Sequence, residues 1–313
     1  MSFSQKCKNE LARKMPDNQC CQLAELSALI RLDGTILLGF HQSLGLRIDT
    51  ENAAVARKVI KLTKTLFNLN SEAIVQRRRR LRKNNVYGIE IRNKIGVQKM
   101  LQKTGVGMFL TAEEENWQKE SLKKACCQKA YLRGVFLGGG SISNPQSGSY
   151  HLEMVMHDPG IVPHLCGLMT KFGLDARQTT RKKAEVIYLK EADQIVQFLN
   201  ITGAHTALLN FESVRIYKDI RNNVNRLVNF ETANLTKSVE ASMRQIEAIQ
   251  LIAGRIGLER LSFALKELAQ ARLEHPDVSL KELGELLDPP VSKSAVNHRM
   301  RRLEQFAERL RKP

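Results

Sequence analysis

The sequence predicts an α+β protein in which an αββαββα arrangement occurs twice, as two halves, before an all-α helix-turn-helix domain. Two observations support this prediction. Residues 20–36 and 126–142 are identical at 7 of 17 positions. From Val239 onward apolar residues recur at helical spacing, and a cap, a turn and a basic helix close the chain. The formal net charge of +17 says nothing about the fold, but it indicates a polyanionic partner, either nucleic acid or an anionic membrane.

The repeat extends beyond its most similar segment. Both copies begin with a CysCys pair, and the offset between the copies is 106 residues. Two apolar stripes at helical spacing keep this offset: Val55, Val59, Leu62 and Leu66 in the first copy, and Ile161, Leu165, Leu168 and Phe172 in the second. One supersecondary unit used twice explains this pattern. We assign residues 1–110 to the first half and 111–203 to the second.

Each half is expected to run helix, two strands, helix, two strands, helix. In the first half we expect these elements at 21–32, 35–41, 44–49, 52–68, 72–82, 85–92 and 94–104. In the second half we expect them at 122–137, 140–144, 149–156, 158–173, 176–183, 185–190 and 191–201. The first helix of each half is rich in small residues: Ala24, Ser27 and Ala28, then Ala130, Gly134 and Gly138. These two helices are therefore expected to pack closely.

Basic residues concentrate on the second pair of strands in each half. In the first half they are Arg77, Arg78, Arg79, Arg80, Arg82 and Lys83, and in the second Arg177, Arg181, Lys182 and Lys183. Charge on an edge strand also prevents aggregation, so a solvated edge is one interpretation. Because both halves place the charge on the same element, we favour the other, a surface that contacts DNA phosphates.

The paired segments LSALIRLDGT (26–35) and LRGVFLGGGS (132–141) resemble the two motifs of a monomeric LAGLIDADG homing endonuclease. The resemblance implies two motif helices at a pseudo-twofold axis and two sheets in the DNA major groove. It also implies a metal-binding acid near the end of each motif, at Asp33 and at Gly139. Gly139 offers no ligand, and Asp33 followed by Gly34 is equally typical of a turn that ends a helix.

Hydrolysis of both strands needs divalent metal held by carboxylates from both helices. We therefore expect no enzyme: no catalytic residue, no metal and no cofactor. An endonuclease that uses Asp33 and a second, unlocated acid remains the alternative. The six cysteines form no CxxC pair, and only His164 and Cys166 come near zinc-ligand spacing. We explain the thiol of that pair as a buried structural one.

The chain shows no sign of a membrane or secreted location. No apolar run approaches the length of a membrane span, and the first residues lack the apolar core of a signal peptide. The few cysteines fit a reducing compartment. We expect a cytoplasmic, nucleoid-associated protein without a membrane partner.

Residues 204–238 are interpreted as a connector rich in Asn, used either for caps and turns or for nucleic-acid contacts. Helices are expected at 239–255 and 258–274. The last domain, 239–313, then forms a helix-turn-helix at 279–311. Ser279 and Glu282 form a capping box, Leu280, Leu283 and Leu287 face inward, and AspProProVal (288–291) makes the turn.

Ser292 is expected to cap the final helix, on which Val296, Met300, Leu303 and Leu310 form the buried stripe. The candidate DNA-binding residues share the cap and the opposite face. They are Ser292, Lys293, Ser294, Asn297, His298, Arg301 and Arg302. Side chains of these types contact base edges and phosphates. A basic amphipathic helix packed on a partner is the alternative.

The combination resembles the WhiA family across nearly the whole chain, most specifically in YLRGVFLGGGSI (131–142), NRLVNFETANLTKSV (225–239) and SLKELGELL with SKSAVNHRMRRL (279–303). The resemblance implies a degenerate LAGLIDADG domain and a helix-turn-helix similar to a promoter-reading domain of sigma factors. It implies a transcription regulator that binds double-stranded DNA at promoters, with RNA polymerase or another regulator as further partner. Its implied roles are cell division, chromosome segregation and, in sporulating relatives, sporulation. An architectural DNA-binding protein is the alternative, and few aromatic residues disfavour RNA.

Overall fold

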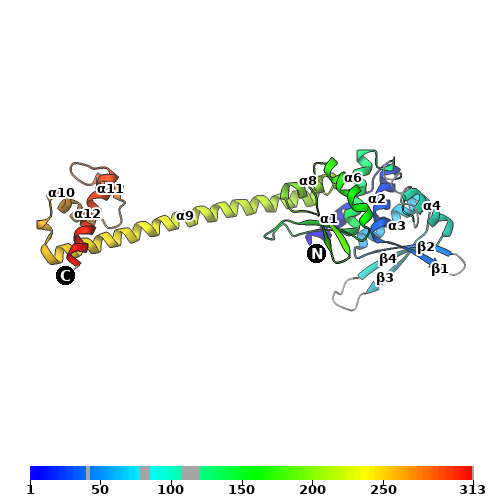
Figure 1. Ribbon diagram of the computed structural model, residues 1–313, viewed down its shortest axis with the longest axis horizontal. Helices are drawn as coiled ribbons and strands as arrows, with labels where there is room; N and C mark the ends of the chain where they lie inside the picture. The colour runs from blue at the N-terminus through cyan, green and yellow to red at the C-terminus, as the bar shows by residue number, and fades with distance from the viewer. Residues whose placement is uncertain (40–42, 78–84, 108–116, 118–119, 312–313) are drawn as a thin grey trace. The chain divides into compact units, whose positions relative to one another are not determined.

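The computed structural model describes residues 1–39, 43–77, 85–107, 117 and 120–311. The chain divides into two compact units, Met1–Lys218 and Asp219–Pro313, here called the N-terminal and C-terminal units. Figure 1 shows the mixed helices and strands of the first and the helices of the second. Within the described residues, no helix combines the length and the apolar character needed to cross a membrane.

The N-terminal unit contains both predicted halves. The first half consists of α2 (Gln19–Asp33), β1 (Gly34–Gly39), β2 (Ser43–Thr50), α3 (Ala53–Phe67), β3 (Glu72–Arg77), β4 (Asn85–Ile91) and α4 (Lys94–Thr104). The second consists of α6 (Ala125–Gly139), β5 (Gly140–Ile142), β6 (Leu152–Met156), the 3₁₀ turn η2 (Pro159–Ile161), α7 (Val162–Lys171), β7 (Arg177–Arg181), β8 (Ala184–Leu189) and α8 (Ala192–Thr202). The predicted αββαββα order is confirmed in both halves, with several strands shorter than expected.

Each half builds a four-stranded antiparallel sheet with an equivalent strand order, β1-β2-β4-β3 in the first and β5-β6-β8-β7 in the second. The register pairs Leu46 with Ile91 and, 106 residues later on β6, Leu152 with Leu189. All four side chains are buried beneath the helices of their half. The basic strands β3 and β7 are therefore equivalent outer strands, as the repeat predicts.

Helices α2 and α6 pack side by side, and they come closest at the small residues that the sequence singled out. A Cβ added to Gly134 would lie 2.5 Å from the carbonyl oxygen of Glu25 and 2.8 Å from the Cβ of Ala28. Gly134 and Ala28 are equivalent positions of the repeat, so each helix presents a small residue where the backbones approach.

A buried ion cluster also joins the two helices. Glu25 of α2 is fully buried, and its carboxylate lies 2.5 Å from the Lys58 ammonium and accepts two hydrogen bonds of 3.1 Å from the Arg133 guanidinium. Lys58 also donates to the Leu11 carbonyl at 2.9 Å, and Arg133 to the Thr202 carbonyl at 3.1 Å. Burial lowers the pKa of Lys58, while the Glu25 carboxylate opposes that shift. Every charge of the cluster thus has a polar partner.

The segment expected as a connector forms part of one long helix. Helix α9 (His205–Ile256) is continuous for 52 residues and includes both 204–238 and the helix expected at 239–255. The reason is visible in the sequence, because no Gly or Pro occurs between 205 and 253. Asn lowers helix propensity only slightly and does not stop a helix. The Asn-rich segment therefore forms helix interior instead of turns.

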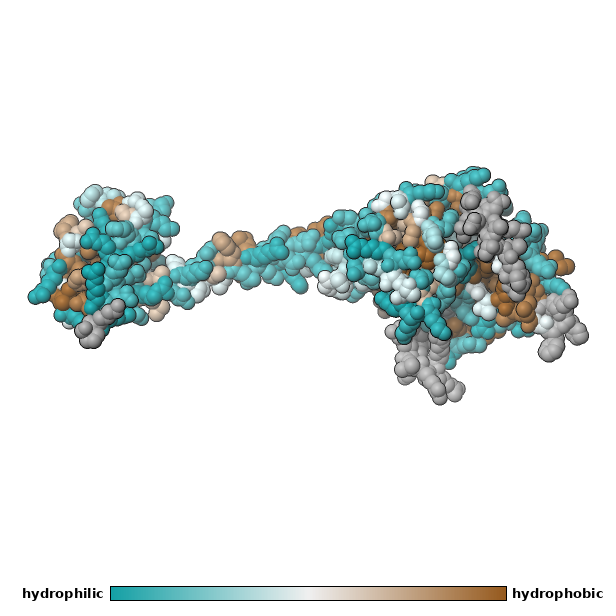
Figure 2. Space-filling model, in the orientation of Figure 1, coloured by the Kyte–Doolittle hydropathy of each residue, from teal (hydrophilic) through white to brown (hydrophobic). Residues whose placement is uncertain are grey.

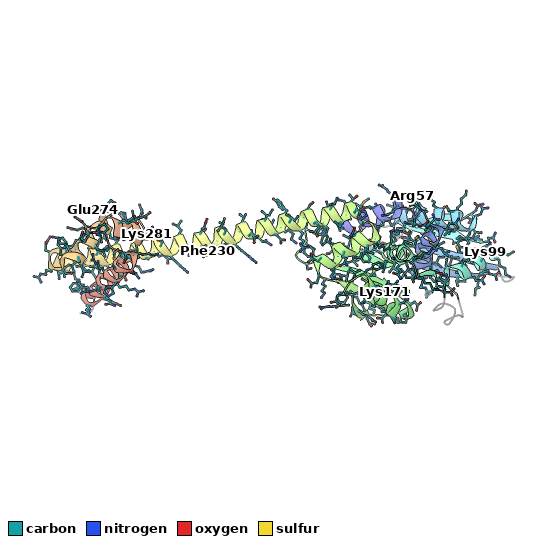
Figure 3. All side chains as sticks on the ribbon, turned by 90° about the horizontal axis from the view of Figure 1, so that it is seen from above. Arg57, Lys99, Lys171, Phe230, Glu274 and Lys281 are labelled. Carbon is teal, nitrogen blue, oxygen red and sulfur yellow. The ribbon has the colours of Figure 1, made fainter. Side chains whose placement is uncertain are left out.

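Much of α9 carries apolar side chains that no core covers. Those with more than half of their surface exposed include Ile216, Tyr217, Ile220, Val224, Leu227 and Phe230. Phe230, the side chain labelled on α9 in Figure 3, projects away from the helix. Hydrogen bonds within the helix hold this stretch in place, since burial contributes little to it.

A further helix, α1 (Phe3–Arg13), was not predicted. It begins with a capping box between Ser2 and Gln5, and its apolar face packs into the core. The Glu10 carboxylate accepts hydrogen bonds from two backbone N–H groups in the first turn of α9, the nearer from Thr206 at 2.7 Å. Helix α1 therefore caps the start of α9.

The C-terminal unit has its own core beneath a helix-turn-helix. After α9 come the 3₁₀ turn η3 (Leu258–Arg260), α10 (Phe263–Glu274), α11 (Leu280–Glu285) and α12 (Lys293–Arg311). The helix expected at 258–274 is divided, because Ser262 begins α10 after η3. The core includes Ile249, Ile252, Leu268, Leu283, Val296, Met300 and Leu303. The stripe predicted for the last helix is confirmed, with Leu310 half-buried at its end.

Candidate nucleic-acid interface

The helix-turn-helix begins and turns as the sequence predicts. The Ser279 hydroxyl accepts from the Glu282 N–H at 3.3 Å, and the Glu282 carboxylate accepts from the Ser279 N–H at 2.8 Å. These hydrogen bonds lower the pKa of Glu282. At the turn, a Cβ on Gly284 would clash with the Val291 carbonyl, so only glycine allows this approach. The capping box thus sets where α11 starts, and Gly284 lets the chain that leads into α12 pass close to α11.

Helix α12 presents the predicted polar residues on its open face. Ser292 caps it by accepting from the Ala295 N–H at 3.3 Å. Ser292, Lys293, Ser294, His298, Arg301 and Arg302 are exposed, and Asn297 is half-buried. None of the basic groups among them has an acidic partner among the ion pairs of the described residues. The view in Figure 2 shows a largely hydrophilic surface on this unit. These side chains are of types that contact phosphates and base edges, and their contact with DNA stays a prediction.

Replacing Arg301 with Ala should weaken binding to a specific DNA site by about 1–3 kcal/mol. The guanidinium lies on the exposed face of α12, so truncation removes the predicted DNA contact without disturbing the core. Competition binding with specific and random duplexes measures the effect. A loss confined to the specific duplex assigns Arg301 to a base, whereas an equal loss on both assigns it to phosphate. Arg260→Ala, also exposed but on η3, is the matched control, and an unchanged affinity in Arg301→Ala would contradict the prediction.

The basic sheet residues divide into those within and those outside the described residues. Arg78, Arg79, Arg80, Arg82 and Lys83 lie outside them. Arg77 is exposed at the end of β3. In the second half Arg177 and Arg181 are exposed on β7, and Lys182 and Lys183 form the turn to β8. Lys182 occupies the left-handed region at φ 60°. The described members thus lie on equivalent outer hairpins, as predicted, and their contact with phosphate stays a prediction.

The sheets also carry acidic groups that the sequence did not point to. In the first sheet Arg47 pairs with Asp49 at 2.9 Å and with Glu90 at 3.3 Å. In the second sheet Glu153 lies 3.5 Å from Arg181, so this guanidinium is not a free cation. Arg47 and Glu153 are equivalent positions of the repeat. Which side chains lie beside them depends on the pairing register of the strands, which the sequence alone does not give. Among the described residues, Arg47 of the first sheet and Arg181 of the second are therefore paired with acidic side chains.

The nuclease positions lie where α2 and α6 end, and they do not form a pair of carboxylates. Asp33 ends α2, and burial raises its pKa to about 6, with the Lys8 ammonium opposing the shift. Lys8 of α1 donates to the Gly138 carbonyl at 3.1 Å. A Cβ on Gly139 would clash with the Val155 carbonyl of β6. The second position therefore has neither an acid nor space for one.

The fold brings together cysteines that local spacing had separated. The Sγ atoms of Cys20, Cys21 and Cys127 all lie within 4.8 Å of one another, the one such group of potential metal ligands among the described residues. His164 and Cys166, both on α7, are not part of it. Local motif spacing missed this cluster, although the two CysCys pairs at equivalent repeat positions were a signal for it.

Three family models match the chain in order. They describe a WhiA N-terminal LAGLIDADG-like domain at residues 19–107, a WhiA LAGLIDADG-like domain at 128–221 and a WhiA C-terminal HTH domain at 224–307. These matches cover both halves and the helix-turn-helix.

Curated proteins and a crystal structure show similarity over the full length. A "Probable cell division protein WhiA" from Heliobacterium modesticaldum is 50% identical, covering 98% of this chain and 96% of that protein. Another from Desulforamulus reducens is 51% identical, covering 99% and 97%. The crystal structure of full-length DUF199/WhiA from Thermatoga maritima aligns with a TM-score of 0.61 at 25% identity, covering 99% of both chains.

Proposed function

Because the chain belongs to the WhiA family, we propose that it is a sequence-specific, non-cleaving, DNA-binding transcription regulator. Its roles are cell division, chromosome segregation and, in sporulating relatives, sporulation. The names of its curated relatives support the first of these roles. Its targets are promoter regions, with RNA polymerase or another regulator as protein partner, and its location is the cytoplasm, at the nucleoid.

The observation that carries this proposal is the open face of α12. Helix α12 follows a tight turn, is capped by Ser292 and buries one apolar face. Its opposite face presents Ser294, His298, Arg301 and Arg302 to solvent. Such a helix reads base edges in the major groove. The outer hairpins of the two sheets would add phosphate contacts. Two modest DNA contacts on one chain reinforce each other through effective concentration.

The absence of cleavage follows from the ends of α2 and α6. Two-strand hydrolysis requires metal ligands from both helices. Asp33 interacts with the Lys8 ammonium, and Gly139 provides no ligand. These observations support a scaffold that has kept a DNA-binding shape and lost its metal chemistry.

Footprinting on pooled genomic fragments, with Mg²⁺ and excess random competitor, tests the proposal. We expect reproducible protected sites and uncut DNA. Specific binding survives a large excess of random sequence. Uniform weak protection would favour an architectural protein instead. Cut ends would establish an endonuclease and make Asp33→Asn the first variant to assay.

Salt dependence tests the electrostatic part of binding. If about six phosphates are contacted, the slope of log affinity against log salt concentration should be about −5. Fluorescence anisotropy with a labelled duplex across a salt series gives the slope. A flat response would refute the predicted phosphate contacts.

A further inference from the structure

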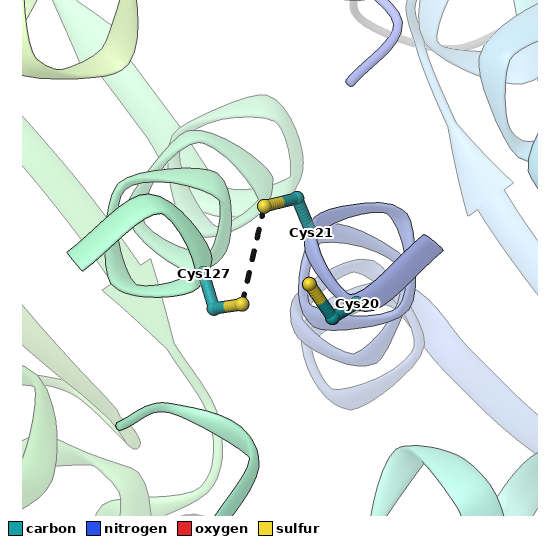
Figure 4. Close-up of side chains that lie close together, drawn as sticks. All are labelled: Cys20, Cys21 and Cys127. Atoms are coloured by element: carbon teal, nitrogen blue, oxygen red, sulfur yellow. Dashed lines mark hydrogen bonds between the residues drawn. The ribbon is translucent and has the colours of Figure 1, made fainter. Parts of the chain in front are cut away.

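The two CysCys pairs of the repeat meet where α2 and α6 begin. The Sγ atoms of Cys21 and Cys127 are 3.9 Å apart across the two helices, and Cys20 lies beside Cys21 on the same helix (Figure 4). Cys20, Cys21 and Cys127 place all three sulfur atoms within 4.8 Å of one another. Three thiols therefore converge at one point, and a fourth, the exposed Cys126, is the residue before Cys127 in the first turn of α6.

The distance between the Cys21 and Cys127 sulfur atoms matches the distance between two sulfur ligands of one thiophilic metal ion. In a tetrahedral Zn²⁺ site with Zn–S bonds of about 2.3 Å, the sulfur atoms lie about 3.8 Å apart. The Cys21–Cys127 separation of 3.9 Å agrees with this value. A disulfide requires about 2.05 Å between the sulfur atoms. All four cysteines are free thiols in the structure.

Both helix starts leave their positive ends uncompensated. The N-cap residues, Asn18 for α2 and Lys124 for α6, form no side-chain capping hydrogen bond, and neither helix has an acidic residue in its first turn. The cysteines occupy these first turns. Thiolates at a helix N-terminus are stabilised by the exposed N–H groups and the helix dipole.

Equivalent hydrogen bonds hold the chain that enters each helix. The Gln22 amide donates to the Pro16 carbonyl at 2.7 Å, and the Gln128 amide donates to the Leu122 carbonyl at 2.7 Å. Both donors and both acceptors are 106 residues apart, so the two approaches to the thiols are constrained in the same way. This preorganisation supports a metal site, because metal-ligating side chains are held in position by hydrogen bonds of the residues around them.

We propose that Cys20, Cys21 and Cys127 bind one Zn²⁺ ion between the two halves, and that the exposed Cys126 turns toward them as the fourth ligand. Binding releases four protons to solvent and leaves a site of net charge −2, which the two helix N-termini and the neighbouring Lys124 offset. With two ligands from each half, the ion would cross-link α2 to α6 and stabilise their packing.

Metal content of the full-length chain, purified under reducing conditions without chelator, tests the proposal. We expect about one zinc ion per chain by elemental mass spectrometry. After exchange of zinc for Co²⁺, we expect a thiolate-to-cobalt charge-transfer absorption band in the near ultraviolet. Cys21→Ser and Cys127→Ser should lose the metal and the band. Cys166→Ser, a half-buried thiol on α7, is the matched control and should keep both.

A second measurement covers the case in which these variants fail to fold. Cys20→Ser and Cys126→Ser change exposed positions, and each should reduce the cobalt–thiolate band by about a quarter, since one of four ligands is lost. A thermal midpoint of the wild-type chain that rises with added Zn²⁺ and falls with chelator supports the site. A metal-free chain without a cobalt–thiolate band, or a Cys21–Cys127 disulfide in peptide mass mapping under native redox conditions, would overturn it.

Discussion

Replacing Glu25 with Ala is expected to lower the free energy of unfolding of the N-terminal unit by about 3–5 kcal/mol. The carboxylate is fully buried between the Lys58 ammonium and the Arg133 guanidinium. Truncation leaves two buried cations without their counterion. Each cation keeps a backbone carbonyl as partner, but carbonyls alone do not neutralise charge.

Denaturant unfolding measures this loss, with Glu72→Ala as control because Glu72 is exposed on β3. The control should change stability by less than about 0.5 kcal/mol. A double variant that also replaces Arg133 with Met should lose less than the sum of the two single losses, because the pair is removed together. Additive losses, or a Glu25→Ala chain as stable as wild type, would show that the cluster is not energetically coupled.

Restoring an acid at the second nuclease position should fail to restore cleavage. Gly139→Asp is expected to destabilise the N-terminal unit by about 3 kcal/mol or more, because its Cβ meets the Val155 carbonyl and its carboxylate enters a packed site. A plasmid nicking assay with Mg²⁺ or Mn²⁺ and a thermal unfolding curve measure the two effects.

The control is Gly148→Asp, which introduces the same side chain where no atom lies within 4 Å of the added Cβ. We expect its stability to match that of wild type. Metal-dependent nicking by Gly139→Asp that disappears on adding Asp33→Asn would contradict the prediction and show that a single lost acid separates this chain from an active nuclease.

The sequence predicts the two-half fold well because local and repeated signals agree. The stripes of α3 and α7 are 106 residues apart and are buried in both halves except at Leu66 and Phe172, which are half-buried, and the motif helices end where strands begin. Helix α9 runs through the Asn-rich segment because no Gly or Pro interrupts residues 205–253, a signal that the Asn-rich composition obscures. Helix α1 was missed because its capping box at Ser2 is the only strong local signal in a polar segment.

The candidate sites show a similar division. The periodicity of one helix and the position of its cap determine which side chains of α12 are exposed, so the sequence predicts their exposure. Arg47, Asp49 and Glu90 meet only through strand register, which composition does not provide. The cysteine cluster joins residues from two helices far apart in the chain, beyond the reach of motif spacing.

The buried ion cluster has a consequence for the descent of the protein from a duplicated unit. The repeat equates Glu25 with Tyr131, Arg133 with Ser27 and Lys58 with His164. Two copies of the first half assembled like α2 and α6 would bury Glu25 opposite Ser27, without the guanidinium that now binds it. The buried cluster therefore favours pairing of the first half with the second over pairing of two first halves, because only the mixed pair gives the Glu25 carboxylate its guanidinium partner.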